Sequence, residues 1–337
     1  MTVLSRARRR CAPSPQGRRM HGFTLVELMV ALTISAILTA GAIQILYSSR
    51  AGFRSNEALA RVQENGRFSM NFLAQDVRGL AGFGCAQQPE VTSQLDSGGG
   101  FSITGPAIQG GEGTGIDIIR ATGPSDSLTI RTADAKQTVG LSENIHAGEN
   151  VKVTAPKPDV DQGDILMITD CANADVFQVS SPPSGSVITH NAGGSVSPGN
   201  NANDFSTDYG RDGNVFPARE TIYSLGTDAA GNPQLERAIN GAAPEVLVDN
   251  VVDLQFLYGE DFDNDNVANA YIDASQVSEW DEVIAVRTRV TIRSNEQAIT
   301  EDPVQLDFNG DGADEAAPDN RLYQTFTTTT AIRNRLP

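Results

Sequence analysis

The feature that most constrains this chain is a long apolar run near its beginning. Residues 23–46 contain a single charged side chain, Glu27, among almost entirely apolar neighbours. As an α-helix, which rises about 1.5 Å per residue, the run would be about 36 Å long, enough to cross a bilayer with some tilt. A carboxylate in hydrocarbon costs a few kcal/mol or more, so Glu27 marks a functional position that requires a partner.

A basic leader precedes the apolar run. Residues 1–22 contain six arginines and no acidic residue. Because positive charge is retained on the cytoplasmic side of a membrane, everything after residue 46 is expected to lie on the opposite side. A translation start at Met20 would remove all six arginines, and we therefore favour an upstream start.

An ordinary secretory signal is the alternative interpretation of the same residues. The leader arginines would form its basic region, and Ala40-Gly41-Ala42 would be its cleavage site. Two observations oppose this alternative. The apolar run is longer than the apolar core of about 7–15 residues that such signals have. The amphipathic pattern also continues without a break past the supposed cleavage site.

Residues 22–28, with the sequence GFTLVEL, resemble the processing site of type IV pilins and of type II secretion pseudopilins. The resemblance implies that a prepilin peptidase cleaves the chain after Gly22 and N-methylates the new N-terminal residue, Phe23. It also implies a role for Glu27, which would neutralise the N-terminal amine of a neighbouring subunit during assembly.

Three further segments, residues 60–85, 285–294 and 323–335, are similar to PilW-type minor pilins. This resemblance implies an α+β, pilin-like fold, in which a long N-terminal α-helix, transmembrane and then amphipathic, packs on a β-rich globular head. It implies a minor pilin that primes or supports type IV pilus assembly. The implied partners are the prepilin peptidase, other minor pilins, the major pilin and the inner membrane. The head would lie in the periplasm and, after assembly, at the pilus tip.

Two other functions stay open. A minor pseudopilin of a type II secretion system is one, because residues 221–225 and 254–258, with Trp280 downstream, resemble that class too. A calcium-dependent adhesin at the pilus tip is the other. An enzyme is not expected, since the chain lacks the G-x-S-x-G, H-E-x-x-H and C-x-x-C motifs. His146 and His190 lie in polar, loop-like sequence, where we expect solvated side chains.

The expected organisation has four parts: the leader at residues 1–22, a transmembrane half-helix at 23–46, an amphipathic half-helix at 47–84 and a β-rich head at 85–337. In the amphipathic half, apolar residues recur near three- and four-residue spacing, which predicts one face packed on the head. Gly66 is a point where this helix could bend. The apolar positions are Leu59, Val62, Phe68, Phe72, Leu73 and Val77.

Strands are predicted throughout the head. Residues 246–258, 283–292 and 323–332 are the clearest, because β-branched and aromatic residues are frequent in them. In 283–292 arginines alternate with apolar residues, which predicts a strand with one buried and one wet face. The Gly- and Asn-rich segments 98–115 and 190–212 are predicted to be mobile surface loops. Shorter strands are expected at residues 115–120, 127–131, 164–169, 176–180 and 221–225.

The exported part of the chain is strongly acidic. Without the leader it has 19 basic and 42 acidic residues, which gives a net charge of −23. Such a surface repels nucleic acid and anionic lipid, so no nucleic-acid partner is expected.

Two cysteines, Cys85 and Cys171, remain once the leader with Cys11 is removed. In an oxidising compartment outside the cytoplasm they are expected to form a disulfide bond. Two separate buried thiols are the alternative.

Two acidic clusters are candidate Ca²⁺ sites, because carboxylates at alternate positions place several hard oxygen ligands on one side of a tight loop. Neither cluster meets the full EF-hand template, and an acidic turn without a metal is the alternative for each. No other cofactor is expected. The first cluster contains Asp261, Asp263 and Asp265. The second contains Asp307, Asn309, Asp311 and Glu315.

Overall fold

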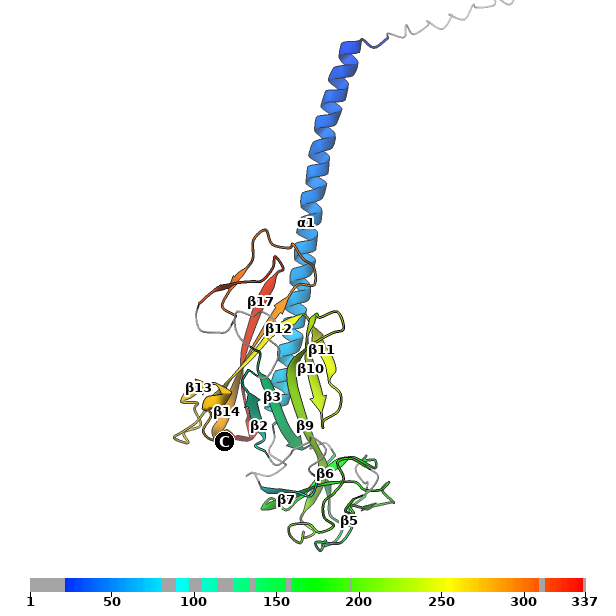
Figure 1. The fold of residues 1–337 in the computed structure, drawn as a ribbon, viewed down its shortest axis with the longest axis vertical. Helices are drawn as coiled ribbons and strands as arrows, with labels where there is room; N and C mark the ends of the chain where they lie inside the picture. The colour runs from blue at the N-terminus through cyan, green and yellow to red at the C-terminus, as the bar shows by residue number, and fades with distance from the viewer. Residues whose placement is uncertain are drawn as a thin grey trace, which may run out of the picture. The chain divides into compact units, whose positions relative to one another are not determined.

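A computed structural model describes residues 22–80, 89–96, 105–113, 124–133, 137–155, 159–193, 196–308 and 313–335. It divides into two compact units, residues 1–54 and 55–337. One helix, α1 (Leu25–Arg78), runs without interruption from the first unit into the second (Figure 1). The long N-terminal helix and the β-rich head expected from the sequence are therefore confirmed.

The described strands of the head form two main sheets. The larger sheet has the order β1 (Glu90–Ser93), β7 (Asn173–Gln178), β6 (Ile165–Thr169), β9 (Asn214–Thr227), β10 (Pro233–Ile239) and β11 (Glu245–Asp249). Strand β9 also pairs with β4 (Val139–Gly140) and with β3 (Ser127–Ala133), which pairs in turn with β2 (Ile108–Gly111). The smaller sheet has the order β13 (Ala270–Ile272), β12 (Val251–Glu260), β14 (Val283–Arg293) and β17 (Tyr323–Ala331).

Shorter elements complete the described head. Two small antiparallel pairs join β5 (Val151–Lys152) to β8 (Val187–Ile188) and β15 (Gln305–Leu306) to β16 (Glu315–Ala316). Short 3₁₀ turns lie at η2 (Ala274–Gln276), η3 (Trp280–Glu282) and η4 (Arg333–Arg335). The strand expected at residues 115–120 lies outside the described residues.

The second half of α1 buries a narrow stripe of mostly small side chains. The stripe recurs every three or four residues, as one helix face requires. Two of the residues expected on this face are instead exposed, Phe68 by 53% and Leu59 by 38%. The prediction was wrong there because it considered only the spacing of large apolar residues. In the structure, large side chains of the head pack against small residues of the helix. The buried positions are Ala58, Val62, Gly66, Ser69, Leu73, Ala74 and Val77.

The packing around Gly66 shows why this stripe needs a small residue. The ring of Phe326 on β17 lies where a Cβ atom at residue 66 would be. The helix is continuous through this position, so Gly66 permits close packing and does not act as the bend that the sequence indicated. Further along, the Tyr223 hydroxyl on β9 donates a hydrogen bond of 2.5 Å to the Asp76 carboxylate of α1. These contacts fix the second half of α1 on the sheets.

Strand β9 contributes residues to three hydrophobic cores, two of which lie at its two ends. Its last part pairs with β3 and β10 and contributes Tyr223 and Leu225 to the core beside α1. Its first part pairs with β4 and β6 and contributes Val215 to a second core, built from residues 141–215. One long strand thus runs from the core beside α1 to the second core (Figure 1).

The predicted strand 246–258 is in fact two strands that belong to different sheets. Asn250 separates them with a φ of 63°, a left-handed conformation that asparagine tolerates better than most residues. Strand β11 pairs with β10 before the break, and β12 pairs with β14 after it. The sequence reads as one strand because β-branched and apolar residues continue on both sides of the turn. On β14 the strand is confirmed, but its arginine face is not wet: Val286 and Val290 are buried on one face, while on the other Arg287 is half-buried and Thr291 is buried.

The described residues of segment 190–212 form a loop, as expected, but this loop is anchored in the second core by buried Asn200, Phe205 and Tyr209. In the other predicted loop, 98–115, residues 108–111 instead form strand β2. Buried Asp175 on β7 accepts hydrogen bonds of 2.7 Å each from the Gln94 amide and from the Ser206 and Tyr209 hydroxyl groups. Burial and this carboxylate both raise the pKa of Tyr209 above its usual range. The polar residues of the segment are thus used to anchor it, and Phe205 fills the core.

Candidate functional site

The candidate assembly site is the beginning of α1. Glu27 lies in the first turn, and its Oε2 accepts hydrogen bonds from the backbone N–H of Thr24, at 3.0 Å, and from the Thr24 hydroxyl, at 3.1 Å. In return the N–H of Glu27 donates to the Thr24 hydroxyl at 3.2 Å. This reciprocal pattern is a capping box, which satisfies two of the free N–H groups at a helix start.

The capping role of Thr24 was missed by the sequence reading, although a signal was present. Thr24 and Glu27 stand three residues apart immediately before an apolar run, which is the T-x-x-E pattern of a capping box. The carboxylate was considered only as a partner for a neighbouring subunit. The structure adds that the same carboxylate helps to start its own helix.

The processing site lies directly before this cap. Gly22 and Phe23 are exposed, and Phe23 is 87% accessible. The rest of the leader, residues 1–21, lies outside the described residues. The structure thus leaves the Gly22–Phe23 peptide open, while cleavage there remains a prediction.

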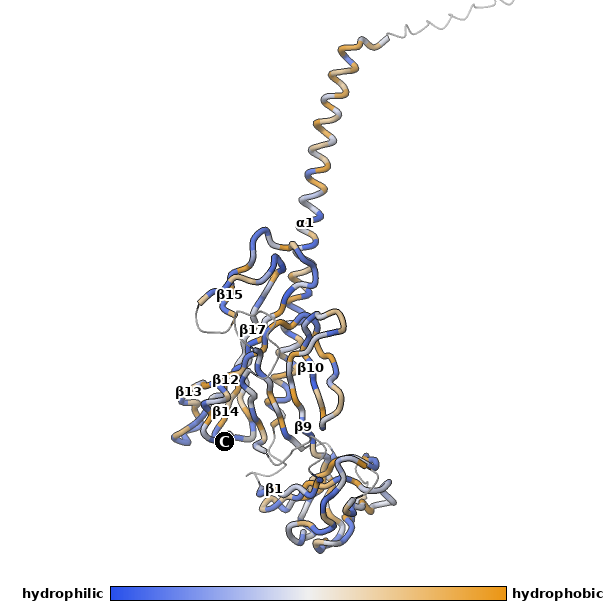
Figure 2. Tube along the Cα trace, viewed as in Figure 1, coloured by the Kyte–Doolittle hydropathy of each residue, from blue (hydrophilic) through white to orange (hydrophobic). Residues whose placement is uncertain are grey.

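The first half of α1 is apolar and unburied. Its large side chains are exposed, with Leu25, Ile37 and Ile45 all above 70%. Figure 2 shows hydrophobic residues recurring along this half of the helix. The helix is long and apolar enough to cross a membrane. Because water does not favour such a surface, this half of α1 needs a lipid or protein environment.

The first acidic cluster forms a tight loop after β12. Carboxylate oxygens of Asp261, Asp263 and Asp265 lie within 4.8 Å of one another. Both oxygens of buried Asp261 already accept backbone N–H groups, from Asp265 at 3.3 Å and from Asn266 at 2.9 Å. Asn266 has a φ of 65°, the left-handed conformation for which calcium loops use glycine. The loop is preformed without a cation, and metal binding there remains a prediction.

The second acidic cluster is only partly described, since Asn309 and Asp311 lie outside the described residues. The Asp307 carboxylate lies 3.4 Å from the Arg289 guanidinium, and Glu315 accepts the N–H of Phe308 at 3.2 Å. Two of the four proposed ligands therefore have other partners, which compete with metal coordination.

The cysteines are also described in part. Cys171 takes part in a disulfide bond in the structure, and Cys85 lies outside the described residues. The pairing of the two remains a prediction. Cys171 has a φ of 70°, and its N–H donates to the Thr169 hydroxyl at 2.9 Å, so it sits in a defined turn between β6 and β7.

The two histidines have different surroundings. His146 is exposed as expected, and Asp208, 2.9 Å away, raises the pKa of its imidazole. His190 is buried, contrary to the sequence reading, because its ring stacks on Phe205 with 4.1 Å between centroids. Burial lowers the pKa of His190. It is a core residue of the second core, and its aromatic ring outweighs its polarity there.

Comparisons with known proteins match two parts of the chain, and one of them includes the start of α1. Residues 17–43 match the prokaryotic N-terminal methylation motif, and residues 222–334 match PilW, the type IV pilus-assembly protein W. None of the curated proteins compared with the chain matches it.

Among solved structures, a type IV-like pilin from Thermus thermophilus is similar at 10% sequence identity. The similarity covers 82% of this chain and 98% of that chain, with a TM-score of 0.35. The methylation motif covers the capped start of α1, and the PilW match covers the end of β9 and the smaller sheet. The chain is thus similar to PilW over its last third and carries an N-terminal methylation motif at the start of its helix.

Proposed function

We propose that this protein is a minor pilin that primes or supports the assembly of a type IV pilus. One observation carries the proposal: the methylation motif coincides with the start of α1, whose exposed apolar first half contains a single carboxylate, that of Glu27. The PilW match supports the type IV pilus over a type II secretion system.

In this proposal a prepilin peptidase cleaves after Gly22, and the apolar half of α1 holds the protein in the inner membrane with its head in the periplasm. The new amine at Phe23 and the carboxylate of Glu27 then carry opposite charges in an apolar layer. An unpaired charge costs about 2.5–3.5 kcal/mol at the centre of a membrane helix on insertion scales, which is an upper figure for the start of α1. Pairing between subunits therefore favours one register of packing.

The charge of the head supports a minor rather than a major subunit. Residues 79–337 carry 14 basic and 38 acidic residues. Many identical heads of this charge would repel one another along a fibre. A single copy in an initiating complex, with other minor pilins and the major pilin, avoids this repulsion.

The substitution Glu27→Gln tests the role of the carboxylate. Glutamine also serves at this position of a capping box, so the helix start is kept while the charge is lost. We expect normal cleavage and N-methylation of Phe23, measured by mass spectrometry, and loss of surface pili, measured by electron microscopy. Glu27→Ala should behave in the same way.

Thr33→Val is the matched control for Glu27→Gln. The Thr33 hydroxyl lies in the same apolar segment and bonds only to carbonyls of its own helix, those of Met29 and Val30. This variant should assemble pili normally. Normal piliation by the Glu27→Gln variant would refute the pairing of charges.

We also propose that the loop of Asp261, Asp263 and Asp265 binds Ca²⁺ and braces β12 against β13. The grouping of three carboxylates within 4.8 Å supports it. Calcium should raise the Tm of the mature protein, and the rise should vanish in the double variant Asp263→Asn, Asp265→Asn, which changes only exposed side chains. An equal Tm with excess calcium and with EDTA would exclude this site.

A further inference from the structure

His190 joins two segments of the head that are distant in the sequence, residues 145–149 and residues 204–209. Its Nε2 lies 2.9 Å from the carbonyl oxygen of Glu149, and its ring stacks on Phe205 with 4.1 Å between centroids. Only 3% of His190 is exposed. One imidazole therefore contacts both segments from inside the second core.

The two segments also bond to each other directly. The N–H groups of Ile145 and Tyr209 donate to each other's carbonyl oxygens, at 2.8 and 2.9 Å. The N–H of Phe205 donates to the carbonyl of Ala147 at 2.9 Å. We call this pairing of the two segments the latch contact. It forms an isolated bridge outside the main sheets, so its opening should cost less free energy than unfolding of the sheets.

The hydrogen bond to Glu149 fixes the protonation of the His190 ring. A carbonyl oxygen only accepts hydrogen bonds, so Nε2 carries the proton of the neutral imidazole. The other nitrogen, Nδ1, is buried and has no hydrogen-bond partner among the described residues. A proton added there places a charged N–H group without an acceptor in an apolar core, which is unfavourable.

The charged groups near the ring do not remove this cost. Asp175 on β7 and exposed Asp204 both favour the charged imidazole, but burial outweighs them and lowers the pKa of His190. The Asp175 carboxylate already accepts hydrogen bonds from three other side chains. Other ionisable side chains near the latch contact are exposed: Glu149, the pair of His146 with Asp208, and the pair of Lys152 on β5 with Glu143.

We propose that His190 is an acid-sensitive latch, and that its protonation opens the latch contact while the sheets of the head stay folded. Opening brings the charged ring into water, where burial no longer opposes the charge. It also uncovers Phe205 and with it one side of the second core. The head thereby changes conformation with the pH around it. This inference does not depend on the proposed function.

The pH dependence has a defined direction. Since burial lowers the pKa of His190, the open form takes up a proton more readily than the closed form. The contribution of His190 to the closed contact is therefore fully present above pH 6.5, the usual pKa of histidine, and is lost as the pH falls through the lowered value. Between these two pH values the open population should rise about tenfold per pH unit, because opening takes up one proton.

Hydrogen exchange measured by mass spectrometry follows the opening in the full mature protein in detergent. Protection factors are compared between pH 7.5 and 4.5, because they remove the intrinsic pH dependence of exchange. Peptides from the latch contact should be less protected than β12 and β14 at every pH, and below pH 6.5 their protection should fall about tenfold per pH unit. Equal protection in the latch contact and in β12 and β14 would overturn the proposal, because exchange would then require global unfolding.

Substitution of each histidine outside the leader assigns the effect. His190→Gln keeps a planar polar group that does not take up a proton, so the loss of protection in acid should disappear. His146→Gln is the matched control in the same contact. Asp208 raises the pKa of His146, whose protonation therefore stabilises the closed contact, so this variant should lose protection in acid at least as steeply as the wild type. A loss of protection that persists in folded His190→Gln would refute the latch.

The wild-type protein decides the question if His190→Gln does not fold. Exchange of the imidazole C2 hydrogen, measured by mass spectrometry, gives the pKa of each histidine. His190 should titrate below pH 6.5 and His146 above it. A pKa of His190 at or above 6.5 would also refute the latch.

Discussion

Among the described residues, the hydrogen bonds to the Glu27 carboxylate end on one of its two oxygens. Both bonds from Thr24 end on Oε2. A carboxylate has lone pairs on both oxygens, so Oε1 stays available for the amine of another subunit. The cap at the helix start and the proposed contact between subunits are therefore compatible, and the first orients the carboxylate for the second.

A second residue of consequence, Asp126, connects the two sheets of the head. Its N–H donates to the carbonyl of Leu254 at 2.8 Å, and its carboxylate accepts the N–H of Phe256 at 2.9 Å and of Gly113 at 3.1 Å. The residue thus pairs with β12 as a short strand would. Its side chain is buried, and burial raises its pKa to about 6.

This pKa predicts a pH dependence of stability. Between the unfolded pKa of 3.8 and the folded pKa of about 6, the folded state binds more protons than the unfolded state. The contribution of Asp126 is therefore complete below pH 3.8 and is lost as the pH rises through 6. Asp126→Asn should remove a change on the order of 2 kcal/mol between pH 4.5 and 7.5, measured by urea unfolding of the mature protein.

The comparison of wild type with Asp126→Asn separates the contribution of Asp126 to the pH dependence of stability from that of His190. The pKa of His190 is lowered by burial, so its contribution is present above pH 6.5 and is lost on acidification. It has the opposite sign and is the same in both proteins. Parallel stability profiles for wild type and variant would show that Asp126 does not titrate in this range.

Among the elements, α1 packs closely on the head at Gly66, where the Phe326 ring leaves no room for a Cβ atom. Gly66→Ala improves helix propensity by up to about 1 kcal/mol, yet its methyl group would overlap the Phe326 ring. Overpacking of this kind costs about 1–3 kcal/mol, and we expect a net loss of stability. Thermal unfolding followed by circular dichroism should show a Tm several degrees lower.

Gly52→Ala is the control for this prediction, because nothing lies within 4 Å of a Cβ atom at residue 52. It gains the same helix propensity without a clash, so its Tm should stay equal or rise. If Gly66→Ala were as stable as Gly52→Ala, close packing on Phe326 would not be the reason for glycine at residue 66.

The sequence predicted strands correctly where one alternating residue pattern corresponds to one strand of one sheet. The arginines and apolar residues of 283–292 alternate with period two, and β14 follows that pattern. The pattern failed at Asn250, where one apolar stretch changes sheets. A local sequence pattern indicates that a residue is buried but not which strand pairs with it. The pattern therefore does not distinguish β11 from β12.

At the scale of the whole molecule, a disulfide between Cys85 and Cys171 would close a loop of about 86 residues. The chain-entropy model gives such a loop about 4–5 kcal/mol as an upper figure. Non-reducing mass spectrometry of the mature protein should find the two peptides linked, and reduction should lower the Tm. Cys171→Ser should abolish this effect of reduction. Alkylation of Cys85 in the unreduced protein would contradict the pairing.

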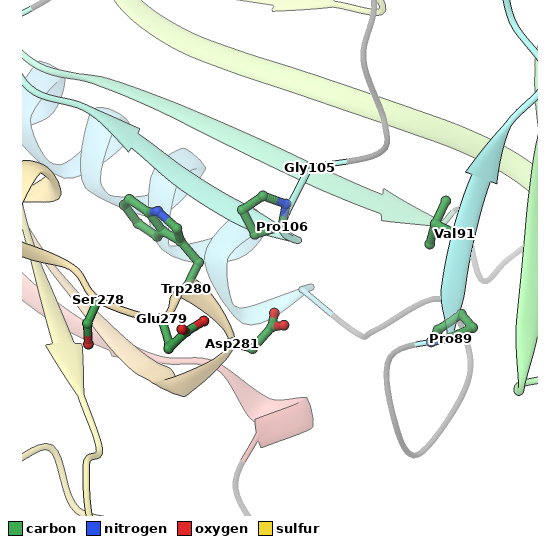
Figure 3. Close-up of a pocket in the computed structure, with 8 residues that line it drawn as sticks. All are labelled: Pro89, Val91, Gly105, Pro106, Ser278, Glu279, Trp280 and Asp281. Carbon is green, nitrogen blue, oxygen red and sulfur yellow. The ribbon is translucent and has the colours of Figure 1, made fainter.

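The sequence by itself determined the basic leader, the apolar helix, the processing motif and the β-rich class of the head. Each of these follows from residues close together in the chain, because helix rise, charge and local periodicity are local properties. The tertiary structure alone decided that Gly66 receives Phe326, that His190 is a core residue and that Trp280 faces Pro89 across a cavity of about 320 Å³ (Figure 3). These depend on contacts between distant residues, where shape and exclusion of water select the partner.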